Sequence, residues 1–183
     1  NDRVVTIDAA IEGAKYIVAE WISDDANYRK DLRFDMMQFG LVVTQLKKNA
    51  EDEKHVYENY YEFQEPVSKI KPHRILAINR AEKEKVITAK LDLDKEKMQN
   101  YLERKVIKNT LSTATPYIKE AIEDAIKRLI YPSIEREVRS ELTDKAEEQA
   151  IDVFSVNLQK LLLQPPLKGK MILGIDPAFR TGC

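Results

Sequence analysis

The feature that most constrains the fold is a long apolar repeat in the C-terminal half of the chain. Its first members recur every four residues: Ile134, Val138, Leu142, Ala146 and Ala150. Further apolar residues continue the pattern at Ile151, Phe154, Leu158, Leu161 and Leu162. Because residues four apart share one face of an α-helix, the repeat predicts one helix of about 30 residues, near 45 Å long. A helix of this length is expected to be a strut between parts of the protein.

Breaks and ion pairs are also predicted around this helix. Pro132 is expected to kink or restart the helix, since proline cannot donate to the preceding turn. The paired prolines Pro165 and Pro166, followed by Gly169, predict a boundary after the helix. Acidic residues stand four positions before basic ones, an order that favours ion pairs on a helix. The three pairs are Asp124 with Arg128, Glu135 with Arg139, and Glu141 with Lys145.

Two helices are predicted in the first 40 residues. The first carries an apolar stripe of Ile7, Ile11, Ala14, Val18 and Trp21. Ser23 is placed to cap the second helix, which Gly40 is expected to end. The apolar face of that second helix is predicted to contain Tyr28, Leu32, Met36 and Phe39.

Two segments before residue 170 have the pattern of strands. Residues 41–46 are short and β-branched, and residues 86–93 alternate between apolar and polar side chains. They are expected to pair, because a lone strand leaves its backbone groups unpaired. The Tyr-rich stretch between them is expected to cover the sheet as a loop or short helix, before Pro72 opens a helix with inward-facing Ile75, Leu76 and Ile78.

Two more helices are predicted before the long one. Asp94 is placed to cap a helix that turns Met98, Tyr101, Leu102 and Val106 inward. Thr115 and Pro116 fit the cap and the first position of the next helix. The predicted fold class is therefore mainly α: a multi-helical chain with one long helix and a small two-stranded β element, followed by a further strand over the apolar segment 171–175. The expected organisation is a helical module with the small sheet over residues 1–108, long linking helices over 109–168, and the start of another domain over 169–183.

Composition excludes several classes of protein. Hydrophobic residues make up 43% of the 183 residues and charged residues 33%. No stretch approaches the roughly 20 apolar residues of a membrane span, and the first residues lack the pattern of a signal peptide. A single cysteine, Cys183, and two histidines supply neither an internal disulfide nor a zinc site. A cytoplasmic protein without a cofactor or metal, and with no membrane partner, is expected.

The charges are unevenly distributed along the chain. Residues 1–68 hold eight Lys/Arg and fourteen Asp/Glu, whereas residues 69–108 hold twelve and six. This basic block is expected either to face phosphate groups or simply to balance the acidic block when the chain folds. Its cations cluster near the predicted helix start at Pro72, a geometry that can hold phosphate. The candidate nucleic-acid-binding residues are Lys69, Lys71, His73, Arg74 and Arg80.

No catalytic residues are assigned. The five glycines are not clustered into a phosphate-binding loop, and neither histidine has a Ser or Cys nucleophile suggested by the sequence. An enzymatic interpretation would rest on Asp176, which follows the apolar segment 171–175. One carboxylate cannot assemble a two-metal nuclease site, and a turn-capping role for Asp176 is favoured. We therefore expect a protein that is not an enzyme.

Three segments carry a resemblance to a known family. They are "KIKPHRILAINRAEKE", "YPSIEREVRSELTDKAEEQAI" and "LLLQPPLKGKMILGIDPAFRTGC", in this order along the chain. Together they resemble the Tex family of bacterial transcription accessory proteins. The resemblance implies that Ile172 to Gly182 open a YqgF domain with an RNase H-like fold, followed by helix-hairpin-helix elements and an S1 RNA-binding domain. In such a domain Asp176 would hold the position of the first metal-binding carboxylate.

The resemblance implies a central scaffold region of a transcription accessory protein that binds RNA or DNA, mainly through domains outside this chain. Two alternatives stay open. The first is a fragment of an active RNase H-like or resolvase-like nuclease, which would need further carboxylates after Cys183. The second is a protein-binding helical module that contacts the transcription machinery, as the related eukaryotic elongation factors do.

Overall fold

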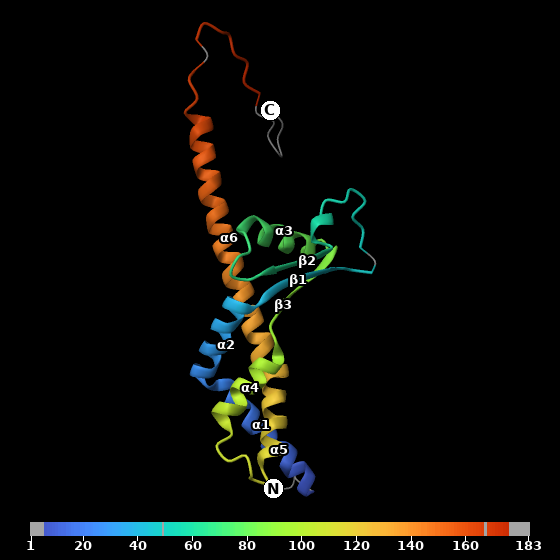
Figure 1. Cartoon of the computed structure of the whole chain (residues 1–183). Coiled ribbons are helices and arrows are strands. Elements are labelled where there is room, and N and C mark those ends of the chain that lie inside the picture. Colours follow the sequence, from blue (N-terminus) through green and yellow to red (C-terminus); the bar gives the residue numbers. More distant parts are fainter. Residues whose placement is uncertain (1–5, 49, 167, 176–183) are drawn as a thin grey trace. The chain divides into compact units, whose positions relative to one another are not determined.

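The computed structural model describes residues 6–48, 50–166 and 168–175, and it confirms a mainly α-helical chain with a small antiparallel sheet (Figure 1). The helices are α1 (Ile7–Asp24), α2 (Ala26–Phe39), α3 (Pro72–Lys83), α4 (Lys95–Val106), α5 (Thr115–Asp124) and α6 (Tyr131–Leu162). The strands are β1 (Leu41–Leu46), β2 (Glu62–Pro66) and β3 (Ile87–Asp92). A 3-10 helix, η1 (Glu58–Tyr60), precedes β2, and a π-helical segment, η2 (Ala125–Ile130), joins α5 to α6.

The chain divides into two units, Asn1–Ala150 and Ile151–Cys183. Among the described residues, every buried side chain lies between Ala19 and Ala146, within the first unit. The 32-residue helix α6 contributes residues to both units, and its length agrees with the predicted long helix. In the second unit the apolar side chains of α6 are exposed: Ile151, Phe154, Leu158, Leu161 and Leu162.

The sheet has three strands in the order β2-β1-β3, so the expectation of a two-stranded element was wrong. The two predicted strands do pair: Val42 lies opposite Leu91, and Thr44 opposite Ala89. The additional strand β2 has the sequence Glu-Phe-Gln-Glu-Pro, without the alternation that marks a half-buried strand. An edge strand needs only one neighbour, which is why a charged segment ending in Pro66 is tolerated there.

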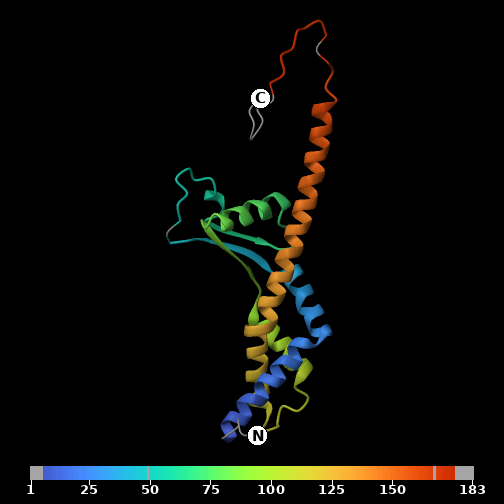
Figure 2. The same ribbon diagram turned by 180° about the vertical axis from the view of Figure 1, so that it is seen from behind.

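One face of the sheet is covered by α3 (Figures 1 and 2). Ile87, Ala89 and Leu91 of β3 are buried together with Ile78 and Ala81 of α3, in one hydrophobic core. As predicted, Pro72 opens this helix and Ile75 and Ile78 are buried, whereas Leu76 is only half-buried. The loop before β2 supports the same core, because the buried hydroxyl of Thr44 donates to the Tyr60 carbonyl at 2.5 Å.

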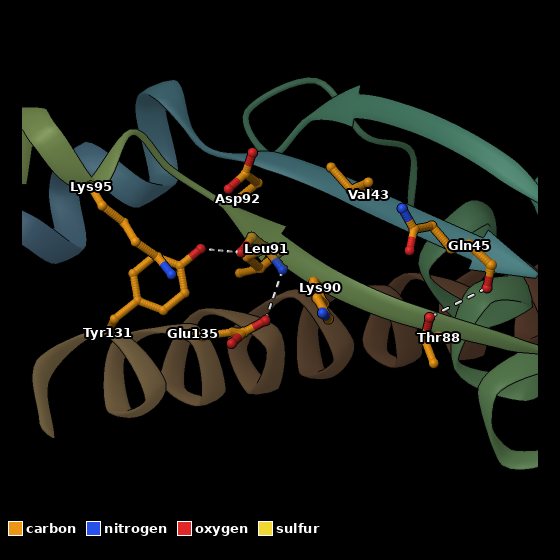
Figure 3. Close-up of a pocket in the computed structure, with 9 residues that line it drawn as sticks. All are labelled: Val43, Gln45, Thr88, Lys90, Leu91, Asp92, Lys95, Tyr131 and Glu135. Carbon is orange, nitrogen blue, oxygen red and sulfur yellow. Dashed lines mark hydrogen bonds between the residues drawn. The ribbon is translucent and has the colours of Figure 1, made fainter. Parts of the chain in front are cut away.

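The free edge of β3 is closed by side chains of α6 (Figure 3). The Tyr131 hydroxyl donates to the Leu91 carbonyl at 2.5 Å, and the Leu91 N–H donates to Glu135 at 2.8 Å. Arg139 donates to the Ala89 carbonyl at 3.2 Å. These three residues of α6 are four apart, about 6 Å along a helix, which nearly matches the two-residue repeat of a strand, about 6.7 Å. One helix face therefore satisfies consecutive main-chain groups of the edge strand.

This arrangement explains why the predicted ion pair between Glu135 and Arg139 is not formed. Glu135 accepts from a strand N–H instead, and Arg139 pairs with Glu82 of α3, with 2.5 Å between Nη2 and Oε2. The other two predicted pairs are present. Asp124 meets Arg128 at 2.8 Å, and Glu141 meets Lys145 at 2.6 Å.

The helix does change at Pro132, as predicted, but by way of a π-helical turn. Pro132 lies in the first turn of α6, immediately after η2. The Tyr131 N–H donates to the Ile126 carbonyl, five residues back, and α-helical bonding resumes from there. The preceding helix, α5, begins at Thr115, whose buried hydroxyl donates to the Asn109 carbonyl at 2.9 Å. Its cap position is Ala114, not Thr115 as expected.

The first two helices form as predicted, but they turn different residues inward. In α1 the buried residues are Ala19, Ile22 and Ser23, whereas Ile7 and Trp21 of the predicted stripe are 80% and 72% exposed. Helix α1 is apolar on more than one side, and its packing against α5 decides which side is buried. The cap of α2 is Asp25, which accepts from the N–H groups of Asn27 and Tyr28 at 2.8 and 3.1 Å. Ser23 is therefore not the cap.

The end of α2 is partly as predicted. Leu32 and Met36 are buried, but Phe39 is 69% exposed. Gly40 ends the helix, and its N–H donates to the Met36 carbonyl at 3.0 Å. A Cβ at Gly40 would lie 2.3 Å from that carbonyl oxygen, so the close approach requires glycine here.

The structure differs from expectation at the C-terminal end. Helix α6 ends at Leu162, before the paired prolines, as predicted. However, the described residues 168–175 contain no strand. A strand needs a hydrogen-bonded neighbour, and nothing in the described part of the chain pairs with this segment. Asp176, Gly182 and Cys183 lie outside the described residues. None of the helices in the described part has the length and apolar character needed to cross a membrane.

Candidate nucleic-acid interface

The turn that precedes α3 places the predicted binding residues. The N–H groups of Lys69 and Ile70 donate to the Pro66 carbonyl at 3.0 and 3.1 Å, which directs the chain from β2 into the helix. Lys71 is the N-cap, and its side chain makes no capping hydrogen bond. Lys69 and Lys71 are both exposed.

The main chain at this helix start offers little to an anion. Pro72 has no N–H, and the N–H groups of Arg74 and Ile75 donate to the Lys71 carbonyl at 2.9 and 3.3 Å. Helix starts that hold phosphate do so with free N–H groups. The helix terminus therefore offers few free N–H groups to a phosphate, and we expect binding here to depend mainly on side-chain charge.

Two of the predicted residues share the exposed face of α3. His73 and Arg80 are seven positions apart, about 10 Å along the helix, and both are exposed. Ile75, Ile78 and Ala81 occupy the opposite, buried face. Two of the five predicted residues, His73 and Arg80, thus share this face, and Lys69 and Lys71 are exposed in the turn that leads into the helix.

Arg74 is the predicted residue that does not join this surface. Its guanidinium donates to Glu65 of β2 at 2.7 Å, and its Cζ lies 5.8 Å from the centre of the Phe63 ring. Arg74 is half-buried, and Glu65 keeps 19% of its side chain exposed. The charge of Arg74 is therefore neutralised within the fold, and its role is to hold α3 against β2.

Sequence analysis missed Lys83, which follows Arg80 by three positions on the same helix face and is exposed. The three-residue spacing was the available signal. We call Lys69, Lys71, His73, Arg80 and Lys83 the α3 surface. Within the part of the chain that the structure describes, none of these five takes part in an ion pair.

The field of Arg80 also reaches a buried tyrosine. Burial raises the pKa of Tyr57, a hydrogen bond to Glu84 raises it further, and the charge of Arg80 acts in the opposite direction. Tyr57 is 6% exposed and belongs to the core. Glu84 and Arg80 thus shift the pKa of the same buried hydroxyl in opposite directions.

A separate hollow of about 410 Å³ lies on the other face of the sheet (Figure 3). It is lined by Val43, Gln45, Thr88, Lys90, Leu91, Asp92, Lys95, Tyr131 and Glu135. Its two lysines and two acids balance, and Tyr131 and Glu135 are engaged with the main chain of Leu91. The Lys95 ammonium lies over the Tyr131 ring, 4.8 Å from its centre. The polar groups of Tyr131 and Glu135 in this hollow therefore serve to bond the free edge of β3, and we assign the hollow no ligand.

Over the described residues, no cluster of three or more His, Cys, Asp or Glu side chains could hold a metal ion.

Comparison with known proteins identifies the family of this chain. The model of the Tex central region-like family matches residues 1–154, which is most of the chain. The chain belongs to the Tex central region-like family. The sequence resemblance to Tex proteins is thereby confirmed, and the matched segment includes the α3 surface, the sheet and most of α6.

Relatives of this Tex-family chain are found in bacteria and in animals. It is 52% identical over 182 residues to the protein YdcI of Bacillus subtilis, with 99% of this chain and 25% of the relative covered. It is 33% identical over 184 residues to the human S1 RNA-binding domain-containing protein 1, covering 93% and 18%. It is 28% identical over 187 residues to the transcriptional accessory protein Tex of Neisseria gonorrhoeae, covering 100% and 25%. The chain thus spans a quarter or less of each of these Tex-like relatives.

Proposed function

We propose that this Tex-family central region is a scaffold within a larger transcription accessory protein and makes a secondary contact with nucleic acid. The names of two relatives support this role, because one is called a transcriptional accessory protein and another an S1 RNA-binding domain-containing protein. The proposed partners are RNA or DNA and the transcription machinery, in the cytoplasm. No catalytic role is proposed.

The observation that carries the nucleic-acid contact is the α3 surface. Four Lys and Arg side chains and one His are exposed there, and the structure pairs none of them with an acid among the described residues. Most hydrogen bonds between proteins and DNA go to phosphate and sugar, and basic side chains supply many of them. A surface of this kind binds phosphates without reading base sequence.

The test measures binding of a fluorescein-labelled single-stranded oligonucleotide, as DNA and as RNA, by fluorescence anisotropy at several salt concentrations. Lys71→Gln combined with Arg80→Gln should weaken binding several-fold. It should also flatten the slope of log K against log salt by about 1.4, since each phosphate contact on a single strand contributes about 0.7. Arg74 is left in place because it is already paired with Glu65.

A charge-matched control removes two exposed lysines elsewhere, by Lys127→Gln with Lys160→Gln. This control should keep the affinity and the salt slope of the parent chain. Equal behaviour of the α3 variant and the control would show that the α3 surface is only a solvated face.

A second candidate function is protein binding, favoured by the exposed apolar residues of α6 in the second unit. Ile151, Phe154, Leu158 and Leu161 follow the 3-4 spacing of a helix face that packs against a partner. In this alternative, the chain would bind a protein of the transcription machinery through this helix face.

A further inference from the structure

The basic block of the sequence does not form one surface in the folded chain. Its first part supplies the α3 surface, and its second part lies on α4, beyond β3 in the chain. Figures 1 and 2 show α3 and α4 on opposite sides of the sheet, within the first unit. Lys95, the first residue of α4, lies over the Tyr131 ring. The other cations of α4 and of the residue pair that follows it are exposed, and we call them the α4 surface: Lys97, Arg104, Lys105 and Lys108.

A shallow hollow of about 460 Å³ lies within the α4 surface. It is lined by Lys97, Asn100, Tyr101, Arg104 and Lys105. The spacing of Lys97, Asn100 and Arg104 puts these three side chains on one exposed stripe of the helix. The inward-facing stripe of α4 is formed by Met98 and Leu102. The hollow therefore combines three cations, an amide and an aromatic ring on one side of a rigid helix.

Three acids lie on or beside α4: Glu96 is exposed in its first turn, whereas Glu103 and Asp94 make contacts within the fold. Glu103 lies 2.9 Å from Lys119 of α5 and accepts from Gln99 at 2.9 Å, and these contacts lower its pKa. Asp94 accepts from the N–H groups of Glu96 and Lys97 as the helix cap, and its contact with the Lys97 ammonium is long, at 3.8 Å. Among the described residues, no ion pair engages Arg104, Lys105 or Lys108.

The aromatic ring of the hollow is held in place. The Tyr101 hydroxyl donates to Asp31 of α2 at 2.5 Å, and the Tyr101 ring meets the edge of Tyr28 at 6.4 Å between centres. The Lys105 ammonium lies 5.6 Å from the centre of the Tyr101 ring. The fixed ring positions the Lys105 ammonium beside it. The neighbouring Arg104 has no ion-pair partner among the described residues and is available to a ligand.

We propose that the α4 surface is a second binding site for nucleic acid, with the phosphates of one strand held by Arg104, Lys105 and Lys97. Arginine suits this task because its planar guanidinium can hold two phosphate oxygens at once. From Lys97 to Lys105 the helix extends about 12 Å, so its cations can contact successive phosphates of one strand. This site rests on the proposed function and extends it to a face that the α3 surface does not reach.

The experiment uses the same labelled oligonucleotide and the same control variant, Lys127→Gln with Lys160→Gln. Arg104→Gln combined with Lys105→Gln should weaken binding several-fold and flatten the salt slope by about 1.4, as for two lost phosphate contacts. Both side chains are exposed, so the far-UV circular dichroism and the unfolding midpoint should stay those of the parent chain.

A second measurement locates the contact directly. In ¹H–¹⁵N spectra of the parent chain titrated with the oligonucleotide, the amide signals of Asn100 to Lys105 should shift, and in the Arg104→Gln, Lys105→Gln variant these shifts should be lost. Signals from His73 to Lys83 report on the α3 surface in the same spectra, so the two sites are judged separately.

Each outcome decides the proposal. If the α4 variant binds as the control does and only the α3 signals shift, the α4 site is wrong and the proposed function stands. If the parent chain binds no oligonucleotide, both are wrong. If poly-glutamate shifts the α4 signals and displaces the oligonucleotide at equal charge concentration, the surface recognises acidic polypeptide, and the nucleic-acid assignment is overturned.

Discussion

Arg139 illustrates how single residues of α6 connect the elements around them. It pairs with Glu82 of α3 and also donates to the Ala89 carbonyl of β3. Burial alone would raise the pKa of Glu82, but the hydrogen bond and charge of Arg139, helped by the Ala89 N–H, lower it overall. Because the folded pKa lies below the unfolded one, this pairing stabilises the fold fully above about pH 4.3, and the stabilisation is lost as the pH falls through the lowered pKa.

Arg139→Gln should therefore lower the free energy of unfolding at pH 7 by about 1 to 3 kcal/mol, because Glu82 and the Ala89 carbonyl lose a charged donor. The loss should shrink as Glu82 becomes protonated in acid. The control is Arg128→Gln, which removes an exposed pair with Asp124 and should cost no more than about 1 kcal/mol. Urea denaturation at pH 7 and pH 3.5 measures both. An equal loss for the two variants at pH 7 would contradict the bridging role of Arg139.

At the scale of elements, α6 is one helix with two environments. Ile134 and Val138 are fully buried, Leu142 is packed against the core in part, and Phe154 is 65% exposed. The repeat in the sequence continues through both sections without a change in period. Burial, and with it the energetic value of each apolar residue, depends on which other elements lie beside it.

Ile134→Ala should lower the free energy of unfolding by about 2 to 5 kcal/mol, as removing a buried branched side chain leaves a cavity. Leu142→Ala should cost less, since its side chain is only partly buried. Phe154→Ala should stay within about 0.5 kcal/mol. Denaturation midpoints of the three variants give this order directly. A cost at Phe154 equal to that at Ile134 would mean that the second section of α6 is packed in solution.

At the scale of the whole molecule, the buried core covers only part of the chain. The described core residues end at Ala146, although the chain continues to Cys183. The two units therefore differ in kind: the first has a hydrophobic core of its own, and the second exposes its apolar side chains. The three-part division at residues 108 and 168 stays a prediction.

A shortened chain ending at Ala150 should consequently fold on its own, with a thermal midpoint less than about 2 °C from that of the full chain. The measurement is thermal unfolding followed by circular dichroism at 222 nm. A fall of about 2 to 4 °C would correspond to roughly 1 kcal/mol for a domain of about 150 to 250 residues. A fall of that amount would show that residues 151–183 stabilise the first unit.

Local physics allowed much of the fold to be predicted from the sequence. Strands were predicted over residues 41–46 and 86–93, and the second forms over 87–92. These strands, the Asp94 cap, the Gly40 stop and the long helix all follow from side-chain period, capping chemistry and backbone preference, which act between near neighbours. The cationic residues around Pro72 were visible for the same reason. The family was also recognisable, because it depends on the order of residues alone.

Tertiary structure alone decided which of these residues are buried and which charges are paired. Helix α1 is apolar on several sides, so its contact with α5, and not its sequence, buries Ile22 and exposes Trp21. Charged residues show the same dependence. Arg74 pairs with Glu65 of β2, and Glu135 accepts a hydrogen bond from the Leu91 N–H of β3. Neither partner could be identified from spacing along the sequence. The sheet then separates one basic block into the α3 and α4 surfaces. The period and composition of a sequence indicate the local secondary structure that its residues favour. Burial and charge pairing depend on residues that are distant in the chain.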